Sequence, residues 1–167
     1  IVVGVDDSRR IVSIKRVESL DTMAGVEFYS GILIPGMVNL HCHLELSYLH
    51  GKIEEHSGFG GFARAIGAIR NNFTEAERLH AASVADSTMW EEGIEAVLDI
   101  ANDELIMEIK GRSHIDYTTL FELFGLGCTS IESHKAMAER GVSCDITPHS
   151  TYSLQDQVFR DAVAANN

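Results

Sequence analysis

Residues 36–51, GMVNLHCHLELSYLHG, place a short apolar run directly before two histidines, His41 and His43, and a glutamate, Glu45. The segment GMVNLHCH suits a β-strand, and side chains alternate between the two faces of a strand. On that basis His41, His43 and Glu45 share one face, while Cys42 points to the other. Two imidazoles on one face lie close enough to share a metal ion, so this stretch predicts either a metal site or two unrelated histidines.

The composition indicates a protein with one globular core, and its charge argues against binding to nucleic acid. The chain has 167 residues, 45% of them hydrophobic, and 13 Lys+Arg against 25 Asp+Glu give a net charge of −12. Nucleic acid and anionic membranes need clustered basic residues, so we expect neither as a partner and favour a small-molecule substrate. No apolar stretch approaches the roughly 20 residues that span a bilayer. Three cysteines without CxxC spacing suit reduced thiols, and we expect a cytoplasmic location.

Strand-like and helix-like segments alternate from Pro35 onward, whereas residues 1–34 are typical of short antiparallel strands. The expected strands after Pro35 are 36–43, 94–101, 115–125 and 142–150. Such alternation predicts an α/β fold with a parallel sheet and crossover helices. Four βα units make up about half of a closed barrel, which typically needs about 250 residues. We therefore expect the N-terminal half of a (β/α)8 TIM barrel, with an open doubly wound sheet as the alternative.

Three helices are indicated by the residues at their ends. Segment 74–93 opens with TEAE, a capping-box pattern, and closes at a glycine. Segment 129–141 opens with TSIE, which repeats the pattern, and also closes at a glycine. A third helix is expected from Ser153, because its apolar residues recur on one side.

The histidine pair has two interpretations when taken alone. An isolated HxH more often combines a structural histidine with a surface histidine than it forms a metal site. Here, however, the pair ends an apolar segment opened by Pro35 and Gly36, and strand C-termini carry the active site in βα barrels. Catalytic zinc usually takes three protein ligands and leaves one position open. His41 and His43 would supply two of those ligands.

Two motifs resemble the amidohydrolase superfamily. ILIPGMVNLHCHLELS, residues 32–47, is similar to its first-strand signature, and ITPHSTYSL, residues 146–154, is similar to the PHxxYS segment that ends strand four in its deaminase branch. The resemblance implies that residues 1–34 are part of a small β-sandwich domain. It implies that residues 35–167 are the first four βα units of a metal-dependent hydrolase barrel. The implied activity is hydrolysis of a non-peptide carbon–nitrogen bond, in the manner of aminodeoxyfutalosine and adenosine-type deaminases.

The resemblance assigns roles to four residues of this chain. His41 and His43 match metal ligands, and His149 matches a histidine that contacts substrate; its alternative is a histidine held by backbone at a strand end. Glu45 alone would be the obvious general base. Because the proton-shuttling glutamate of the family follows strand five, Glu45 is instead assigned to the substrate pocket or to the shell behind it, with a solvated loop carboxylate as the alternative.

The remaining expectations concern the metal and the limits of this chain. The strand before His149 holds no lysine to bridge two metals, so the resemblance favours one divalent ion, zinc first and iron second. The third metal histidine and the general acid–base glutamate are expected beyond residue 167, so this chain alone should be inactive. Asn102 and Asp103 are explained by helix capping. Two alternatives for the function stay open: a chlorohydrolase or other C–N hydrolase on the same scaffold, and a non-catalytic half-barrel binding module. A homo-oligomer also stays open as a partner state.

Overall fold

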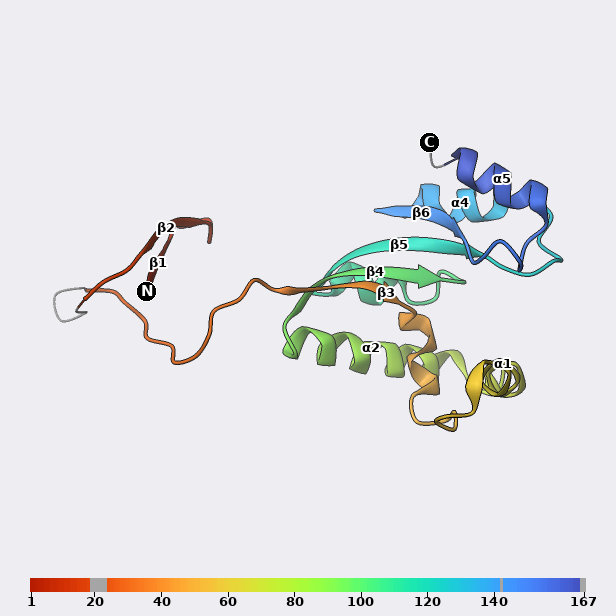
Figure 1. Ribbon diagram of the computed structural model, residues 1–167, viewed down its shortest axis with the longest axis horizontal. Helices are drawn as coiled ribbons and strands as arrows, with labels where there is room; N and C mark the ends of the chain where they lie inside the picture. The colour runs from red at the N-terminus through yellow and green to blue at the C-terminus, as the bar shows by residue number, and fades with distance from the viewer. Residues whose placement is uncertain (19–23, 142, 166–167) are drawn as a thin grey trace. The chain divides into compact units, whose positions relative to one another are not determined.

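The computed structural model describes residues 1–18, 24–141 and 143–165, and the chain divides into two compact units, 1–34 and 35–167. In the first unit, β1 (Val2–Val5) pairs antiparallel with β2 (Ile11–Lys15). The antiparallel pairing expected for this segment is confirmed. The described residues of the unit form this one hairpin (Figure 1) and show no sandwich.

A four-stranded parallel sheet organises the second unit. Its strands are β3 (Met37–Cys42), β4 (Ile94–Ala101), β5 (Asp116–Leu123) and β6 (Cys144–Pro148). They lie in the order β3-β4-β5-β6, each parallel to the next, and Figure 1 shows them side by side. The four strands and their parallel pairing were therefore predicted correctly. This arrangement brings the carboxyl ends of all four strands to one edge of the sheet.

Helices lie in the connections between these strands, and one more helix follows β6. They are α1 (Gly58–Ile69), α2 (Glu75–Glu91), α3 (Met107–Arg112), α4 (Glu132–Arg140) and α5 (Asp156–Ala165). The capping box of α2 is confirmed: Thr74 Oγ1 accepts from the backbone N of Glu77 at 3.3 Å, and Glu77 Oε2 accepts from the backbone N of Thr74 at 2.8 Å. The second capping box is wrong, because α4 follows Ile131 and no side chain caps it. The helix expected from Ser153 begins three residues later.

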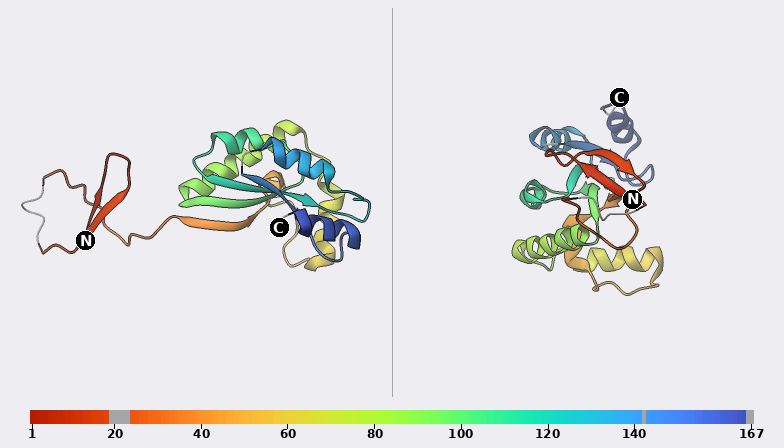
Figure 2. Two further views of the ribbon diagram at one scale, coloured as in Figure 1. Left: turned by 90° about the horizontal axis from the view of Figure 1, so that it is seen from above. Right: turned by 90° about the vertical axis from the view of Figure 1, so that its left-hand side faces the viewer.

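The helices bury one face of the sheet, and Figure 2 shows α2, α3 and α4 on the same side of it. Two buried clusters lie on that face. One consists of Leu44, Ala82, Val97, Ile106, Ile115 and Tyr117. The other consists of Ala101, Phe121, Leu123, Ile131, Ile146, Leu154, Val158 and Ala162. Because strand side chains alternate, Glu122 of β5 lies on the opposite face from Phe121 and Leu123, and this face is free to carry a site.

The sheet is open at both edges within the part of the chain that the structure describes. β3 pairs only with β4, and β6 pairs only with β5, so these four strands form an open sheet and no closed barrel. Along the free edge, Val38 and Leu40 are 59% and 71% exposed. Over the described residues, no helix has the length and apolarity that crossing a membrane requires.

Candidate functional site

Each of the four strands ends in or near a polar side chain at the carboxyl edge of the sheet. His41 lies at the end of β3, and His43 precedes the short 3-10 helix η1 (Leu44–Leu49). Asn102 follows β4, Glu122 lies one residue from the end of β5, and His149 follows β6 directly. A backbone hydrogen bond joins the ends of β5 and β6 at this edge, since His149 N donates to Leu123 O at 3.0 Å.

His41 and His43 are neighbours in the structure. Their ring centroids are 5.2 Å apart at an interplanar angle of 72°. His41 is exposed, and its backbone N donates to Asn39 Oδ1 at 3.1 Å. His43 Nδ1 is buried and has no hydrogen-bond partner among the described residues. A buried imidazole nitrogen without a partner is unfavourable unless something binds it, so the pair fits a group that accepts imidazole ligands.

The described part of the chain supplies two such ligands and no third. Among those residues, no three histidine, cysteine, aspartate or glutamate side chains are grouped so that they could hold a metal ion. Catalytic zinc usually needs three protein ligands. The donor chemistry of His41 and His43 therefore fits a zinc-type ion, while the set is one protein ligand short.

Glu45 does not continue the strand face on which the sequence analysis placed it with His41 and His43. β3 ends at Cys42, and Glu45 sits in η1, 1% exposed. The alternative of a solvated carboxylate is therefore wrong. Its Oε1 accepts from the backbone N and from Nδ2 of Asn102 at 3.3 and 3.0 Å, whereas its Oε2 is buried without a hydrogen bond in the described structure. Burial raises the pKa of the Glu45 carboxyl, and the Asn102 hydrogen bond offsets only part of that effect.

Asn102 is a site residue that sequence reasoning missed. Helix capping is wrong for it and for Asp103, because α3 starts at Met107 behind Ile106. The Asn102 amide instead bridges two carboxylates, since Nδ2 also donates to Glu122 Oε2 at 3.3 Å. Asp103 pairs with Arg78 of α2 at 2.5 Å. The available signal was the position of Asn102 at a strand end, where βα folds gather functional side chains.

A buried ion pair lies behind the site, on the helix-covered face. Asp99 of β4 and Lys110 of α3 are 0% and 3% exposed at their side chains, and Asp99 Oδ2 lies 2.5 Å from Lys110 Nζ. Lys110 Nζ also donates to Thr119 Oγ1 at 2.9 Å. The sequence analysis predicted neither the burial nor the pairing of these two charged residues. The signal for Asp99 was present, because a lone aspartate inside the apolar run IEAVLDIA predicts a buried charge with a partner.

His149 is exposed at the end of β6, and neighbouring side chains contact its imidazole ring at Nδ1 and along one edge. Nδ1 lies 3.0 Å from Ser153 Oγ and 3.2 Å from Ser150 Oγ. The Phe124 ring packs edge-on against the imidazole at 4.8 Å between centroids. Because these hydroxyls engage Nδ1, the other ring nitrogen, Nε2, is left for an external partner.

Comparison with known proteins finds this architecture among solved structures. No protein-family model matches the chain, and no curated protein does either. The structure of Helicobacter pylori aminofutalosine deaminase, determined in complex with methylthio-coformycin, is similar to this chain with a TM-score of 0.63 and 18% identity. The match covers 78% of this chain and 34% of the deaminase chain. The likeness shows the fold: an open parallel sheet like part of a TIM-barrel deaminase. This chain spans about a third of the length of that relative.

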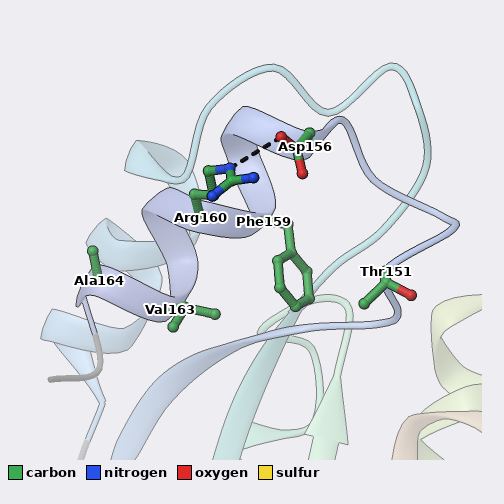
Figure 3. Close-up of a pocket in the computed structure, with 6 residues that line it drawn as sticks. All are labelled: Thr151, Asp156, Phe159, Arg160, Val163 and Ala164. Atoms are coloured by element: carbon green, nitrogen blue, oxygen red, sulfur yellow. Dashed lines mark hydrogen bonds and ion pairs between the residues drawn. The ribbon is translucent and has the colours of Figure 1, made fainter.

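A separate hollow beside α5 does not contain the predicted site residues. Its volume is about 450 Å³, and it is lined by Thr151, Asp156, Phe159, Arg160, Val163 and Ala164. Figure 3 shows Asp156 and Arg160 joined on one side of it, and their Oδ2 and Nε atoms are 3.0 Å apart. The hollow is open to solvent, and its lining offers one exposed ion pair in place of converging polar groups. We therefore place the candidate site at the carboxyl edge of the sheet.

Replacing Glu45 with glutamine should make the protein more stable at pH 8. The glutamine Oε1 can keep both hydrogen bonds from Asn102, while Nε2 takes the place of the unpartnered oxygen. Because the pKa of Glu45 is raised above its ordinary 4.5, its stabilising contribution is complete below pH 4.5 and is lost as pH rises through the folded value. Urea midpoints at pH 4 and pH 8 should show the gain only at pH 8. Equal gains at both values would contradict this account.

Proposed function

We propose that this chain contributes the first four βα units of a metal-dependent hydrolase that acts on non-peptide carbon–nitrogen bonds, with deamination of an amino-substituted purine-type ring as the reaction. Residues 35–167 would be the barrel part and residues 1–34 part of a small β-sandwich. Support comes from the likeness to a deaminase fold and from the polar side chains gathered at the carboxyl edge of the sheet, where βα barrels carry their active sites.

The observation that carries the proposal is the adjacency of His41 and His43 at this edge, with the buried Nδ1 of His43 unpaired. These two residues would hold one divalent ion, zinc in first place and iron in second. When bound, the ion supplies Lewis-acid activation of the hydrolytic water.

The other residues of the edge would hold the substrate. The unpartnered Glu45 Oε2 can accept from a ring N–H or an exocyclic amine. His149 offers Nε2 to a ring nitrogen, while Ser153 and Phe124 fix its imidazole. Asn102 keeps the Glu45 carboxylate in place. No residue within 1–18, 24–141 or 143–165 is assigned the general acid–base role.

Zinc binding tests the observation directly. The full chain should bind about one Zn²⁺, and the His41→Ala/His43→Ala double variant should bind at least about tenfold more weakly, because the paired imidazoles are removed. Measurement is by equilibrium dialysis with metal analysis. The matched control is His50→Ala/His56→Ala, in which two exposed histidines are removed. Undiminished zinc binding in the His41 and His43 variant would rule out these residues as ligands and remove the basis of the proposal.

The reaction itself needs a second assay. Since the chain spans about a third of the deaminase that it resembles, ammonia release from 6-aminopurine nucleosides is to be measured on the whole protein that carries this chain. Release that disappears in the zinc-deficient double variant supports deamination. Zinc binding without ammonia release would direct the assignment to another C–N hydrolase or to a binding module.

A further inference from the structure

Asp99 occupies an unusual position behind the histidine site. It lies in β4 directly opposite Cys42 of β3 in the parallel register. Its Oδ1 accepts a hydrogen bond from the backbone N of Leu44 at 2.7 Å. Leu44, which follows His43, is therefore attached to a buried carboxylate 55 positions away along the chain, while Cys42, which precedes His43, is paired with the same residue in the sheet.

These attachments act where the backbone changes conformation. β3 ends at Cys42 and η1 begins at Leu44, so His43 is the single residue between two elements, with φ −126° and ψ 73°. Cys42 and Leu44 pack with the buried cluster on the helix-covered face. A hydrogen bond from a backbone N–H to a carboxylate is charge-assisted and roughly twice as strong as a neutral one. Fixing both neighbours restricts the orientation of the His43 side chain.

A buried carboxylate at this position needs a counter-charge, and α3 provides it. Lys110 forms an ion pair with Asp99 and also donates a hydrogen bond to the Thr119 hydroxyl on β5. Buried ion pairs add little stability compared with apolar residues of similar size, because desolvation offsets the attraction. The consequence of this pair is therefore geometric: it permits an ionised acceptor to sit beneath the strand-to-helix junction.

We propose that Asp99 is a positioning residue for His43: its carboxylate, neutralised by Lys110, acts as a clamp on the backbone N–H of Leu44 and thereby aims the His43 imidazole at the site. The assignment of a metal to His43 rests on the proposed function. The clamp itself is a property of the folded chain and can be measured without metal.

Two double variants separate the clamp from the ion pair. Asp99→Asn/Lys110→Met removes both charges but keeps an oxygen that can accept from Leu44 N, whereas Asp99→Leu/Lys110→Met removes both charges and the acceptor. The first should bind Zn²⁺ within about threefold of the parent chain, and the second about tenfold or more weakly, as for other groups that orient a metal ligand. Thr119→Val is the control, because it removes a partner of Lys110 without touching the clamp. Equal zinc affinity in the two double variants would overturn the proposal.

Hydrogen–deuterium exchange provides the readout that needs no metal. In the parent chain and in Asp99→Asn/Lys110→Met, the Leu44 amide should exchange slowly, while Asp99→Leu/Lys110→Met should exchange it at least tenfold faster. Fast exchange of Leu44 in the parent chain would refute the clamp, even if the leucine variant failed to fold. If the parent chain binds no more zinc than His41→Ala/His43→Ala, the proposed function fails, and the exchange result still decides on the clamp.

Discussion

Replacing Lys110 with methionine is expected to lower the free energy of unfolding by about 3–5 kcal/mol, because it leaves the Asp99 carboxylate buried without its counter-charge. The side chains of Asp99 and Lys110 are 0% and 3% exposed, and their charged atoms lie 2.5 Å apart. Water cannot replace the ammonium at such a site without opening the packing around it. Since small domains are stable by only about 5–15 kcal/mol in total, this variant should be close to unfolding at room temperature.

The same helix supplies a control of equal geometry. Arg112 of α3 pairs with Glu108 at the same 2.5 Å distance, but the two side chains are 79% and 72% exposed. Arg112→Met should change the free energy of unfolding by less than about 1 kcal/mol, because exposed pairs contribute little. Urea denaturation followed by circular dichroism measures both variants, and Asp99→Asn/Lys110→Met should recover much of the loss. Similar effects for Lys110→Met and Arg112→Met would show that the buried pair is hydrated.

The parts of the fold that could be predicted are those with local signals. β4 has the same bounds, 94–101, as the apolar run that predicted it. The capping box of α2 is formed by Thr74 and Glu77, three residues apart, so sequence spacing alone contains the whole interaction. Parallel pairing followed from the alternation of strands and helices, because parallel strands need a crossover connection.

Three elements lack such signals, and their bounds were not predicted. α3 has only six residues, which is too short for a periodic apolar pattern to appear. α1 begins in the glycine-rich GFGG, and glycine disfavours helix interiors, so local propensity pointed to a loop. The strand pattern of β3 was extended through Glu45, but the chain turns at His43 into η1. Alternation predicts a shared face only as long as the strand continues.

The site shows the same division between local and distant information. The adjacency of His41 and His43 could be predicted, because the two residues are only two positions apart in the chain. The environment of Glu45 could not, since its partner Asn102 is 57 residues away and arrives only when β4 pairs with β3. The clamp on His43 depends on β4 and α3 together. Residue types at strand ends indicate where a site lies, whereas the contacts that orient those residues emerge from tertiary packing.

The second large effect is expected in the core that supports this edge. Phe121 of β5 is 1% exposed and belongs to the buried cluster between the sheet and the helices α4 and α5. Phe121→Ala should lower the free energy of unfolding by about 3–5 kcal/mol, because it removes buried apolar surface and leaves a cavity that a central strand cannot close. β5 cannot move to fill this cavity, because it is paired on both sides, with β4 and with β6.

Phe124, three residues later, is the matched control. It is 53% exposed and contacts the His149 ring instead of the core. Phe124→Ala should change stability by about 1 kcal/mol or less, because a half-exposed ring loses little burial. Thermal and urea unfolding of the two variants, at one protein concentration, give the comparison. If the two alanine variants proved equally stable, the packing of β5 against α4 and α5 would be refuted, and the position that β5 gives to Glu122 beside Asn102 would lose its support.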